Sequence, residues 1–336
     1  MRIAVDAMGG DYAPREIVAG AVQAAQEIAG VEAMFLVGHE EQIGEELGKL
    51  KDGVPATVKV VHATQVVGMD ESPASAVRRK KDSSIARACD LVKNGEADAL
   101  FSAGSTGAAV ASCQLKWRTL EGVQRPGIAT VFPSPTKPFL LIDAGATPDA
   151  TPEILRQFAV MGSVYSREIL GVASPKVGLM SIGEEDAKGN EITKETFRLL
   201  EKSHLNFSGN IEGHDLFEGE IDVVVCDGFV GNVILKTAES VGHAMSTWIK
   251  QEFTKNAFRI AGALLLRGAL KAFKKKVNPE TYGGAPLLGV NGICTIGHGS
   301  SSAYAALNGI RAAAEAVKQD INHIIVEEVK RLEPAS

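Results

Sequence analysis

Five short apolar segments of this chain each run directly into a loop rich in Gly, Asp, Ser or Asn. An apolar run without alternation predicts a strand buried on both faces, and hence a parallel sheet covered by helices. The loop after such a strand lies at the sheet's carboxyl edge, where open α/β folds bind ligands. We therefore expect the five loops to meet at one edge and, with the adjoining helix N-termini, to bind an anion. The five predicted strands are Arg2–Asp6, Ala99–Phe101, Phe139–Ile142, Val177–Met180 and Val223–Val225.

Amphipathic segments alternate with predicted strands along the first half of the chain. Two long segments depart from this order: Lys236–Lys276 predicts one or two helices, and Ser302–Leu332 predicts a single C-terminal helix. With no repeat or linker, residues 1–336 are expected to form one three-layer, Rossmann-like α/β domain with a parallel or mixed sheet. A helical excursion over residues 236–280 should protrude from it. The other predicted elements are strands at Ala33–Val37 and Val58–His62 and helices at Pro14–Ala29, Ser84–Asn94, Thr106–Arg118, Pro152–Glu168 and Lys194–Lys202.

Charge and cysteine content narrow the class of protein. The net charge of −6 argues against general nucleic-acid binding. The four cysteines show no CxxC spacing, which is typical of free thiols in a reducing compartment. No signal peptide and no apolar run long enough to span a membrane is visible, so we expect a cytoplasmic protein.

The segment from Lys250 to Lys276 is strongly basic. It holds eight Lys or Arg residues and one acid, Glu252, a local charge of +7 that leaves −13 for the rest of the chain. Large apolar side chains are interleaved with these cations. This pattern is typical of a helix lying on an anionic membrane surface. A dimer-interface helix pair with solvated charges, or a dock for an acidic protein partner, would show the same pattern.

Several motifs of familiar enzyme classes are missing. The chain has no GxxxxGK[ST] nucleotide loop, no GxGxxG after the first strand and no HExxH, so we expect no nucleotide cofactor and no metal. His298 stands close to Ser300, Ser301 and Ser302, a group that we interpret as a helix N-cap rather than a Ser–His nucleophile pair. The Gly- and Ser-rich loops remain as the candidate phosphate site.

Six motifs occur in order between Met1 and about Glu328: Asp6–Pro14, Val77–Ser84, Ser102–Ala108, Asp227–Asn232, Tyr282–Ala285 and His298–Ser301. Together they resemble the bacterial acyl-ACP:phosphate acyltransferase family (PlsX). Two residues depart from the family pattern, because Ser105 and Thr147 stand where Asn is usual.

The resemblance implies a reaction in which acyl-ACP and inorganic phosphate give acyl phosphate and free ACP. It also implies a homodimer and a fold like that of isocitrate and isopropylmalate dehydrogenases and phosphotransacetylase. The product would pass to a membrane glycerol-3-phosphate acyltransferase. Phosphate is already a nucleophile near neutral pH, so the protein has only to bind it, place it and stabilise the oxyanion.

Loop residues supply the predicted site. Phosphate should be held by Gly9, Gly10, Ser102, Gly104, Ser105, Thr106 and Gly107 and neutralised by Lys80 or Lys81. On the catalytic side, Lys188 or Lys236 adds positive charge and Asn232, or a nearby backbone N–H, stabilises the oxyanion. Asp227 is also a candidate, although Asp6, Asp143 and Asp227 are better explained as helix caps that orient cations than as general bases.

Acyl phosphate, the implied product, hydrolyses readily. An enzyme bound to the bilayer surface through its basic segment would shorten the transfer of acyl phosphate to the membrane acyltransferase. We therefore expect a peripheral membrane protein. Contact with ACP, the acyl chain or the membrane is predicted for Arg78, Arg79, Phe258, Arg259, Leu264, Leu265, Leu266, Arg267 and Lys271. Three alternatives remain: a phosphotransacylase using a coenzyme A thioester, an NAD-dependent decarboxylating dehydrogenase and a non-catalytic membrane scaffold.

Overall fold

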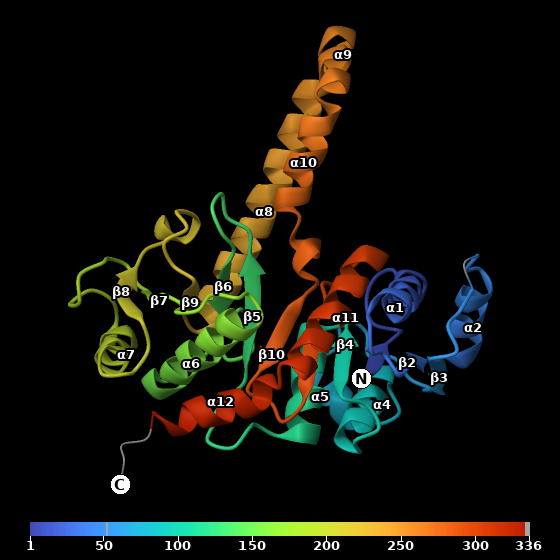
Figure 1. Ribbon diagram of the computed structural model, residues 1–336, viewed down its shortest axis with the longest axis horizontal. Coiled ribbons are helices and arrows are strands. Elements are labelled where there is room, and N and C mark those ends of the chain that lie inside the picture. Colours follow the sequence, from blue (N-terminus) through green and yellow to red (C-terminus); the bar gives the residue numbers. More distant parts are fainter. Residues whose placement is uncertain (52, 333–336) are drawn as a thin grey trace.

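The computed structural model describes residues 1–51 and 53–332, and its centre is one continuous eleven-stranded sheet (Figure 1). The strand order is β3-β2-β1-β4-β11-β10-β5-β6-β9-β7-β8. Four of these strands, β5, β8, β10 and β11, were not recognised in the sequence. The strands are β1 (Arg2–Asp6), β2 (Ala33–Gly38), β3 (Val58–His62), β4 (Ala99–Ser102), β5 (Gly127–Phe132), β6 (Phe139–Ile142), β7 (Val177–Met180), β8 (Phe207–Ile211), β9 (Val223–Val225), β10 (Ala285–Leu288) and β11 (Ile293–Ile296).

The two halves of this sheet run in opposite directions. Strands β3, β2, β1, β4 and β11 are parallel to one another, and so are β6, β9, β7 and β8. Between the halves, the pairs β11–β10, β10–β5 and β5–β6 are all antiparallel. Three reversals place the loops after β1 and β4 at one edge and the loops after β6, β7 and β9 at the other. The expectation that all five loops share an edge is therefore wrong.

Helices cover both faces of the sheet, as the sequence predicts. In β1, Ile3 and Val5 pack in the core under α1 and α11, whereas Ala4 faces the core under α4 and α5. The helices are α1 (Arg15–Glu27), α2 (Glu40–Gly48), α3 (Pro73–Arg79), α4 (Ser84–Lys93), α5 (Thr106–Trp117), α6 (Pro152–Glu168), α7 (Glu191–Glu201), α8 (Gly228–Phe253), α9 (Ala257–Leu265), α10 (Arg267–Val277), α11 (Ala303–Lys318) and α12 (Ile321–Lys330), with the 3₁₀ turns η1 (Asp215–Phe217) and η2 (Pro279–Tyr282).

Most predicted helices agree with the observed bounds to within three residues, but two helical segments differ more. The C-terminal segment is two helices rather than one, because Asp320 adopts a left-handed conformation (φ 49°) that ends α11 and redirects the chain into α12. The helical excursion begins at Gly228, not at Lys236, because Asp227 caps α8 directly after β9.

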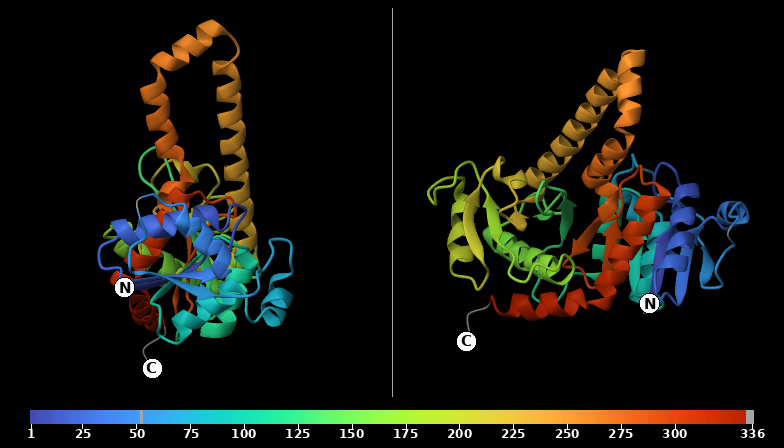
Figure 2. Two further views of the ribbon diagram at one scale, coloured as in Figure 1. Left: turned by 90° about the vertical axis from the view of Figure 1, so that its right-hand side faces the viewer. Right: turned by 45° about the horizontal axis from the view of Figure 1, so that its top comes forward.

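The excursion is a hairpin of α8, α9 and α10 that projects well beyond the sheet (Figure 2). Helix α8 has 26 residues, about 39 Å at 1.5 Å per residue. Only its first turns contact the core, where Val230, Ile234, Leu235 and Ala238 pack on one face of the sheet. The rest of the hairpin therefore presents a large surface to its surroundings.

Candidate functional site

The loops after β1, β4 and β11 contact one another at one edge of the sheet. The amide of Asp11 donates to the Gly299 carbonyl at 2.7 Å, and the amide of Gly297 donates to the Ser102 carbonyl at 2.8 Å. At Gly9 a side chain has no room, because a Cβ there would lie 2.6 Å from the Gly104 nitrogen. The glycine-rich sequence is thus what lets the first two loops touch.

A small pocket opens beside this contact. The enclosed part has room for about one water, and the empty volume of about 230 Å³ includes open solvent at the mouth. Strand ends form its floor, the segment after β3 forms one wall, and the starts of α4 and α5 form the other. The lining residues are Asp6, Met8, Gly9, Val66, Val67, Ser84, Ile85, Ser102, Gly104, Ser105 and Ala108.

Helix α5 starts at this pocket without a side-chain cap. Ser105 stands at its N-cap position, but the hydroxyl accepts no hydrogen bond from the first turn. Helix α4, whose first residues also line the pocket, is uncapped like α5, whereas α6, α8 and α11 are capped by Thr151, Asp227 and Ser302. Uncapped N–H groups and the positive end of the helix dipole favour an anion at the start of α5. The start of α5, at the open mouth of the pocket, is therefore suited to an oxyanion such as phosphate.

A carboxyl group lies at the bottom of this pocket. Asp6 is 3% exposed, and its Oδ2 accepts a hydrogen bond from the Ser102 hydroxyl at 2.7 Å. Its other oxygen, Oδ1, is buried without a hydrogen-bond partner. Burial raises the pKa of Asp6, although the hydroxyls of Ser84 and Ser102 and the amide of Met8 oppose the shift. Asp6 caps no helix, so its predicted role as a cap is wrong.

Four of the predicted phosphate-binding residues line the pocket: Gly9, Ser102, Gly104 and Ser105. Three others lie next to it but outside the lining, namely Gly10, Thr106 and Gly107. Gly10 has a φ of +109° and turns the β1 loop against Gly299 and Ala103, whereas Gly107 leaves room for Pro73 of α3. Sequence reasoning missed Ser84 and Val66, which no Gly-rich loop marks.

The predicted cations do not reach the pocket in this conformation, and none of the described lining residues is basic. Lys80 forms an ion pair with Glu71 and donates to the Val66 carbonyl at 2.7 Å, so it holds the segment that forms one pocket wall. Lys81, Arg78 and Arg79 are exposed. Their roles toward phosphate or ACP stay predictions.

The predicted catalytic residues gather around the second half of the sheet. Asp227 caps α8, as expected, by accepting a hydrogen bond from the Val230 amide at 2.8 Å. Asn232 is exposed and faces Gly145. Lys236 is exposed and pairs with Glu239 at 2.8 Å, and Lys188 is exposed after β7.

These residues are far from the pocket. Strands β4 and β6 are four positions apart, about 19 Å at 4.8 Å per strand, and their carboxyl ends lie at opposite edges. Within one chain, Asp227 and Asn232 therefore do not share a site with Ser102. Their catalytic roles stay predictions.

Asp143 organises the second edge rather than capping a helix. Its carboxylate accepts four backbone hydrogen bonds at 2.6–3.0 Å, from Ile128, Gly145, Ala146 and Thr147. Burial raises the pKa of Asp143, and the four N–H donors oppose that shift. The predicted capping role is wrong, since Thr151 caps α6 instead.

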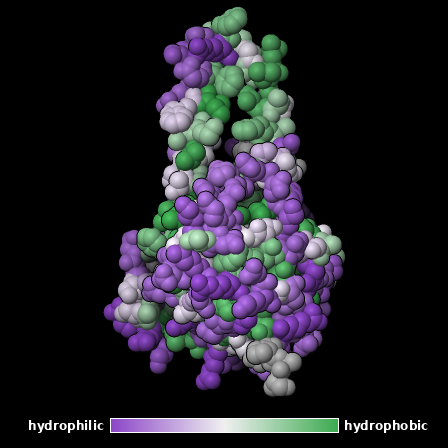
Figure 3. Space-filling model, turned by 90° about the vertical axis from the view of Figure 1, so that its left-hand side faces the viewer, coloured by the Kyte–Doolittle hydropathy of each residue, from purple (hydrophilic) through white to green (hydrophobic). Residues whose placement is uncertain are grey.

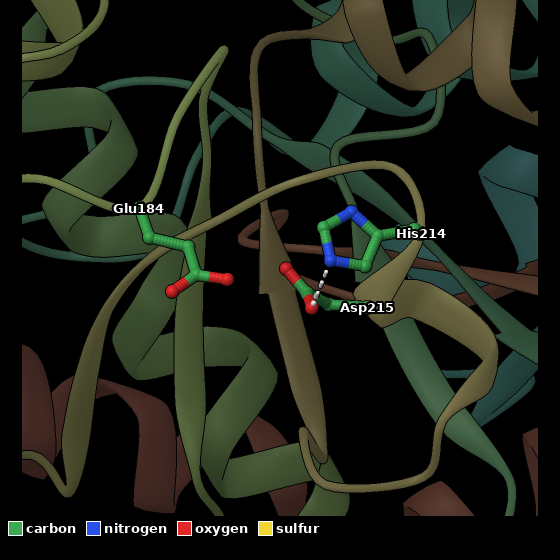
Figure 4. A group of neighbouring side chains, drawn as sticks. All are labelled: Glu184, His214 and Asp215. Carbon is green, nitrogen blue, oxygen red and sulfur yellow. Dashed lines mark ion pairs between the residues drawn. The ribbon is translucent and has the colours of Figure 1, made fainter.

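One group of possible metal ligands comes together among the described residues (Figure 4): Glu184 from the loop after β7, and His214 and Asp215 beside η1. The His214 Nε2 atom lies 3.2 Å from Asp215 Oδ1, so the imidazole already has a partner. Glu184 and His214 are exposed. Ion pairing at the surface explains this arrangement, and we assign no metal to it.

The loop after β11 carries the predicted Ser–His group. Ser302 caps α11 by accepting a hydrogen bond from the Ala305 amide at 3.2 Å, as expected. The His298 Nδ1 atom lies 2.8 Å from the Ser300 hydroxyl, but both residues are exposed and outside the pocket lining. This geometry favours a loop-stabilising contact.

The tip of the hairpin exposes the predicted apolar contact residues. Phe258 and Leu265 are each 89% exposed, and Leu264 and Leu266 are also exposed. Apolar side chains gather along the projecting helices (Figure 3). Beside them, Arg267 and Lys271 line a groove between α8, α9 and α10 with an empty volume of about 800 Å³ that includes open solvent. Arg259 pairs with Glu252.

None of the helices that the structure describes is both long enough and apolar enough to cross a lipid bilayer.

Comparison with known proteins identifies the family. The model of the fatty acid synthesis protein family matches residues 1–324. A phosphate acyltransferase from Pelotomaculum thermopropionicum is 50% identical over 333 residues, which cover 99% of this chain and 96% of that protein. The chain belongs to this family. The resemblance predicted from the loop motifs is therefore confirmed.

Solved structures share the fold at low identity. A phosphotransacetylase from Streptococcus pyogenes matches with a TM-score of 0.63 and 17% identity, covering 94% of each chain. A 4-hydroxythreonine-4-phosphate dehydrogenase from Klebsiella pneumoniae matches with a TM-score of 0.51 and 15% identity, over 94% of this chain and 98% of that one. The predicted dehydrogenase-like fold is confirmed.

Proposed function

We propose that this chain transfers a fatty acyl group from acyl-ACP to inorganic phosphate, giving acyl phosphate and free ACP. The observation that carries the proposal is the pocket at the uncapped start of α5, which suits a small oxyanion. The relatives are named phosphate acyltransferase, which agrees with this proposal in the acceptor, phosphate, and in the reaction, acyl transfer. The enzyme is accordingly an acyltransferase.

The pocket supplies what this reaction needs. Phosphate at the start of α5 is held by backbone N–H groups and by the hydroxyl of Ser105, while Ser102 donates its own proton to Asp6 and fixes the floor of the pocket. The attacking oxygen then faces the open mouth, where the thioester must arrive. No acyl-enzyme is required, because phosphate is itself the nucleophile.

The hairpin of α8, α9 and α10 supports two further parts of the proposal, a homodimer and contact with a membrane. Helix α8 exposes an apolar row at helical spacing, Phe229, Val233, Val241, Met245 and Trp248, which suits a second copy of the chain. Beyond this row, the tip combines Phe258 and Leu265 with Lys and Arg side chains. We therefore propose that the enzyme is a homodimer. We also propose that it binds as a peripheral protein to the anionic cytoplasmic surface of a membrane.

Membrane contact also suits the fate of the product. Acyl phosphate combines an acyl chain with an anionic headgroup, so release at a bilayer would deliver it to a membrane glycerol-3-phosphate acyltransferase. ACP, which is acidic, would approach the exposed cations Arg78 and Arg79 near the pocket wall. No cofactor is needed for any of these steps.

The test is turnover by the purified chain. We expect thiol release from acyl-ACP that depends on phosphate, and acyl phosphate that hydroxylamine traps as a hydroxamate. Ser102→Ala should raise the KM for phosphate. Ser112→Ala is the matched control, because this buried hydroxyl in α5 has no hydrogen-bond partner. Faster turnover with acyl-CoA than with acyl-ACP would favour a coenzyme A phosphotransacylase, and absence of thiol release would exclude both.

A further inference from the structure

The bottom of the phosphate pocket contains a group that is unfavourable for simple anion binding. Asp6 is a carboxyl group, and a carboxylate beside a bound dianion repels it. The uncapped start of α5 and the Ser84 hydroxyl, by contrast, favour negative charge. The position of Asp6 therefore calls for an explanation.

The two oxygens of this carboxyl group differ. Oδ2 is held by the Ser102 hydroxyl at 2.7 Å and lies against Gly9, where a Cβ would be only 2.8 Å away. Oδ1 is buried and has no partner. A buried polar atom without a partner costs free energy unless a ligand completes its hydrogen bonding. The Ser84 hydroxyl and the Met8 amide favour the charged form of Asp6 but form no hydrogen bond with Oδ1, so a protonated oxygen of the ligand can supply the missing partner.

We propose that Asp6 makes the site specific for an oxyanion that carries a proton: Oδ1 accepts the O–H of monohydrogen phosphate. This inference rests on the proposed function. Sulfate has the same shape and charge but carries no proton near neutral pH. Bound sulfate would leave two unprotonated oxygens facing each other, so the pocket rejects it.

The same hydrogen bond accounts for the proton during acyl transfer. A phosphate oxygen attacks the thioester carbonyl carbon, a C–O bond forms and the C–S bond breaks. Monohydrogen phosphate loses one proton in this step, and the leaving thiolate gains one. The Asp6 carboxylate takes the phosphate proton as the C–O bond forms and afterwards releases it to solvent, and solvent protonates the leaving thiolate. The net reaction of monohydrogen phosphate and thioester therefore gives acyl phosphate dianion and thiol, with atoms and charges balanced.

The first test compares anions on the wild-type enzyme. Sulfate should inhibit poorly against phosphate, whereas arsenate, which is protonated like phosphate, should compete with it. We expect the sulfate Ki to exceed the phosphate KM by about tenfold to a hundredfold, as for a buried acceptor that loses its partner. Sulfate that competes as well as arsenate would overturn the inference, although phosphate-dependent turnover would still support the proposed function. Absence of that turnover would refute the function itself.

The second test uses Asp6→Asn. An amide offers N–H donors to an unprotonated oxygen, so the ratio of sulfate Ki to phosphate KM should fall at least about tenfold. A purely structural role would weaken both anions equally and leave this ratio unchanged, which would count against the proposal. Thermal unfolding of the variant shows whether it folds. If it does not fold, the wild-type comparison decides alone.

Discussion

Gly9→Ala tests directly whether the contact between the β1 and β4 loops builds the site. The new Cβ would lie 2.6 Å from the Gly104 nitrogen, 3.0 Å from the Gly104 Cα and 2.8 Å from Asp6 Oδ2. Ordinary contacts begin near 3.4 Å, so the loops must separate by about 0.8 Å. Neither the backbone nor Asp6 can easily move, because the Ser102 hydroxyl holds the carboxyl group.

The expected effect on activity is larger than the effect on stability. Overpacking of this kind costs about 1–3 kcal/mol of unfolding free energy. A shift approaching 1 Å in a group that positions substrate lowers turnover by up to about a hundredfold. We therefore expect kcat/KM for phosphate to fall by one to two orders of magnitude in a variant that remains folded at 25 °C.

The assay combines urea unfolding with initial rates at varied phosphate. Gly44→Ala is the matched control, because no atom lies within 4 Å of its Cβ position on the exposed side of α2. Replacing this glycine should leave kcat/KM unchanged and stabilise the fold by up to about 1 kcal/mol. Wild-type kcat/KM in Gly9→Ala would refute the assignment of the site to this loop contact.

Three further changes probe other parts of the account. Asp143→Asn should lower the unfolding free energy by about 2–4 kcal/mol in urea titrations, because an amide cannot accept all four backbone hydrogen bonds. A loss below about 0.5 kcal/mol would contradict this role of Asp143. Leu265→Glu at the tip should weaken flotation with anionic vesicles, whereas Ile182→Glu, at a comparably exposed site on the body, should not. Equal flotation of the two variants would exclude the tip as the contact. The Thr64 hydroxyl and amide, with Arg87, lower the pKa of Asp82 to about 2. The Asp82 carboxylate therefore stabilises the fold fully above about pH 4, and this contribution is lost as the pH falls toward 2. Asp82→Asn should flatten the stability curve in that range, and an unchanged curve would refute the pairing.

Much of the pocket could be predicted from the sequence, because its parts are local. An apolar run followed by Gly9 or Gly104 marks a buried strand and a close loop, and Ser105 before an apolar helical segment marks a helix start. These signals depend on neighbouring residues alone. For the same reason, the loop residues Gly9, Ser102, Gly104 and Ser105 come together at one pocket as the sequence indicates.

The arrangement of the loops could not be predicted in this way. A buried strand such as Phe139–Ile142 has the same composition in either direction, so nothing in it shows that the second half of the sheet is reversed. The reversal depends on β5 and β10: each forms an antiparallel hairpin with its neighbour in sequence, β6 or β11, and the two pair with each other although they are distant in sequence. The role of Asp6 likewise depends on burial, and the pairing of Lys80 with Glu71 depends on a fold that brings the two side chains together.

The central claim is that phosphate binds where the loops after β1 and β4 meet. Crystals of the full chain soaked in arsenate, with its position read from the anomalous scattering of arsenic, test this claim directly. The account predicts arsenate at the start of α5, in contact with Asp6, Ser84 and Ser102. Arsenate beside Asp227 and Asn232, with the pocket empty, would contradict it.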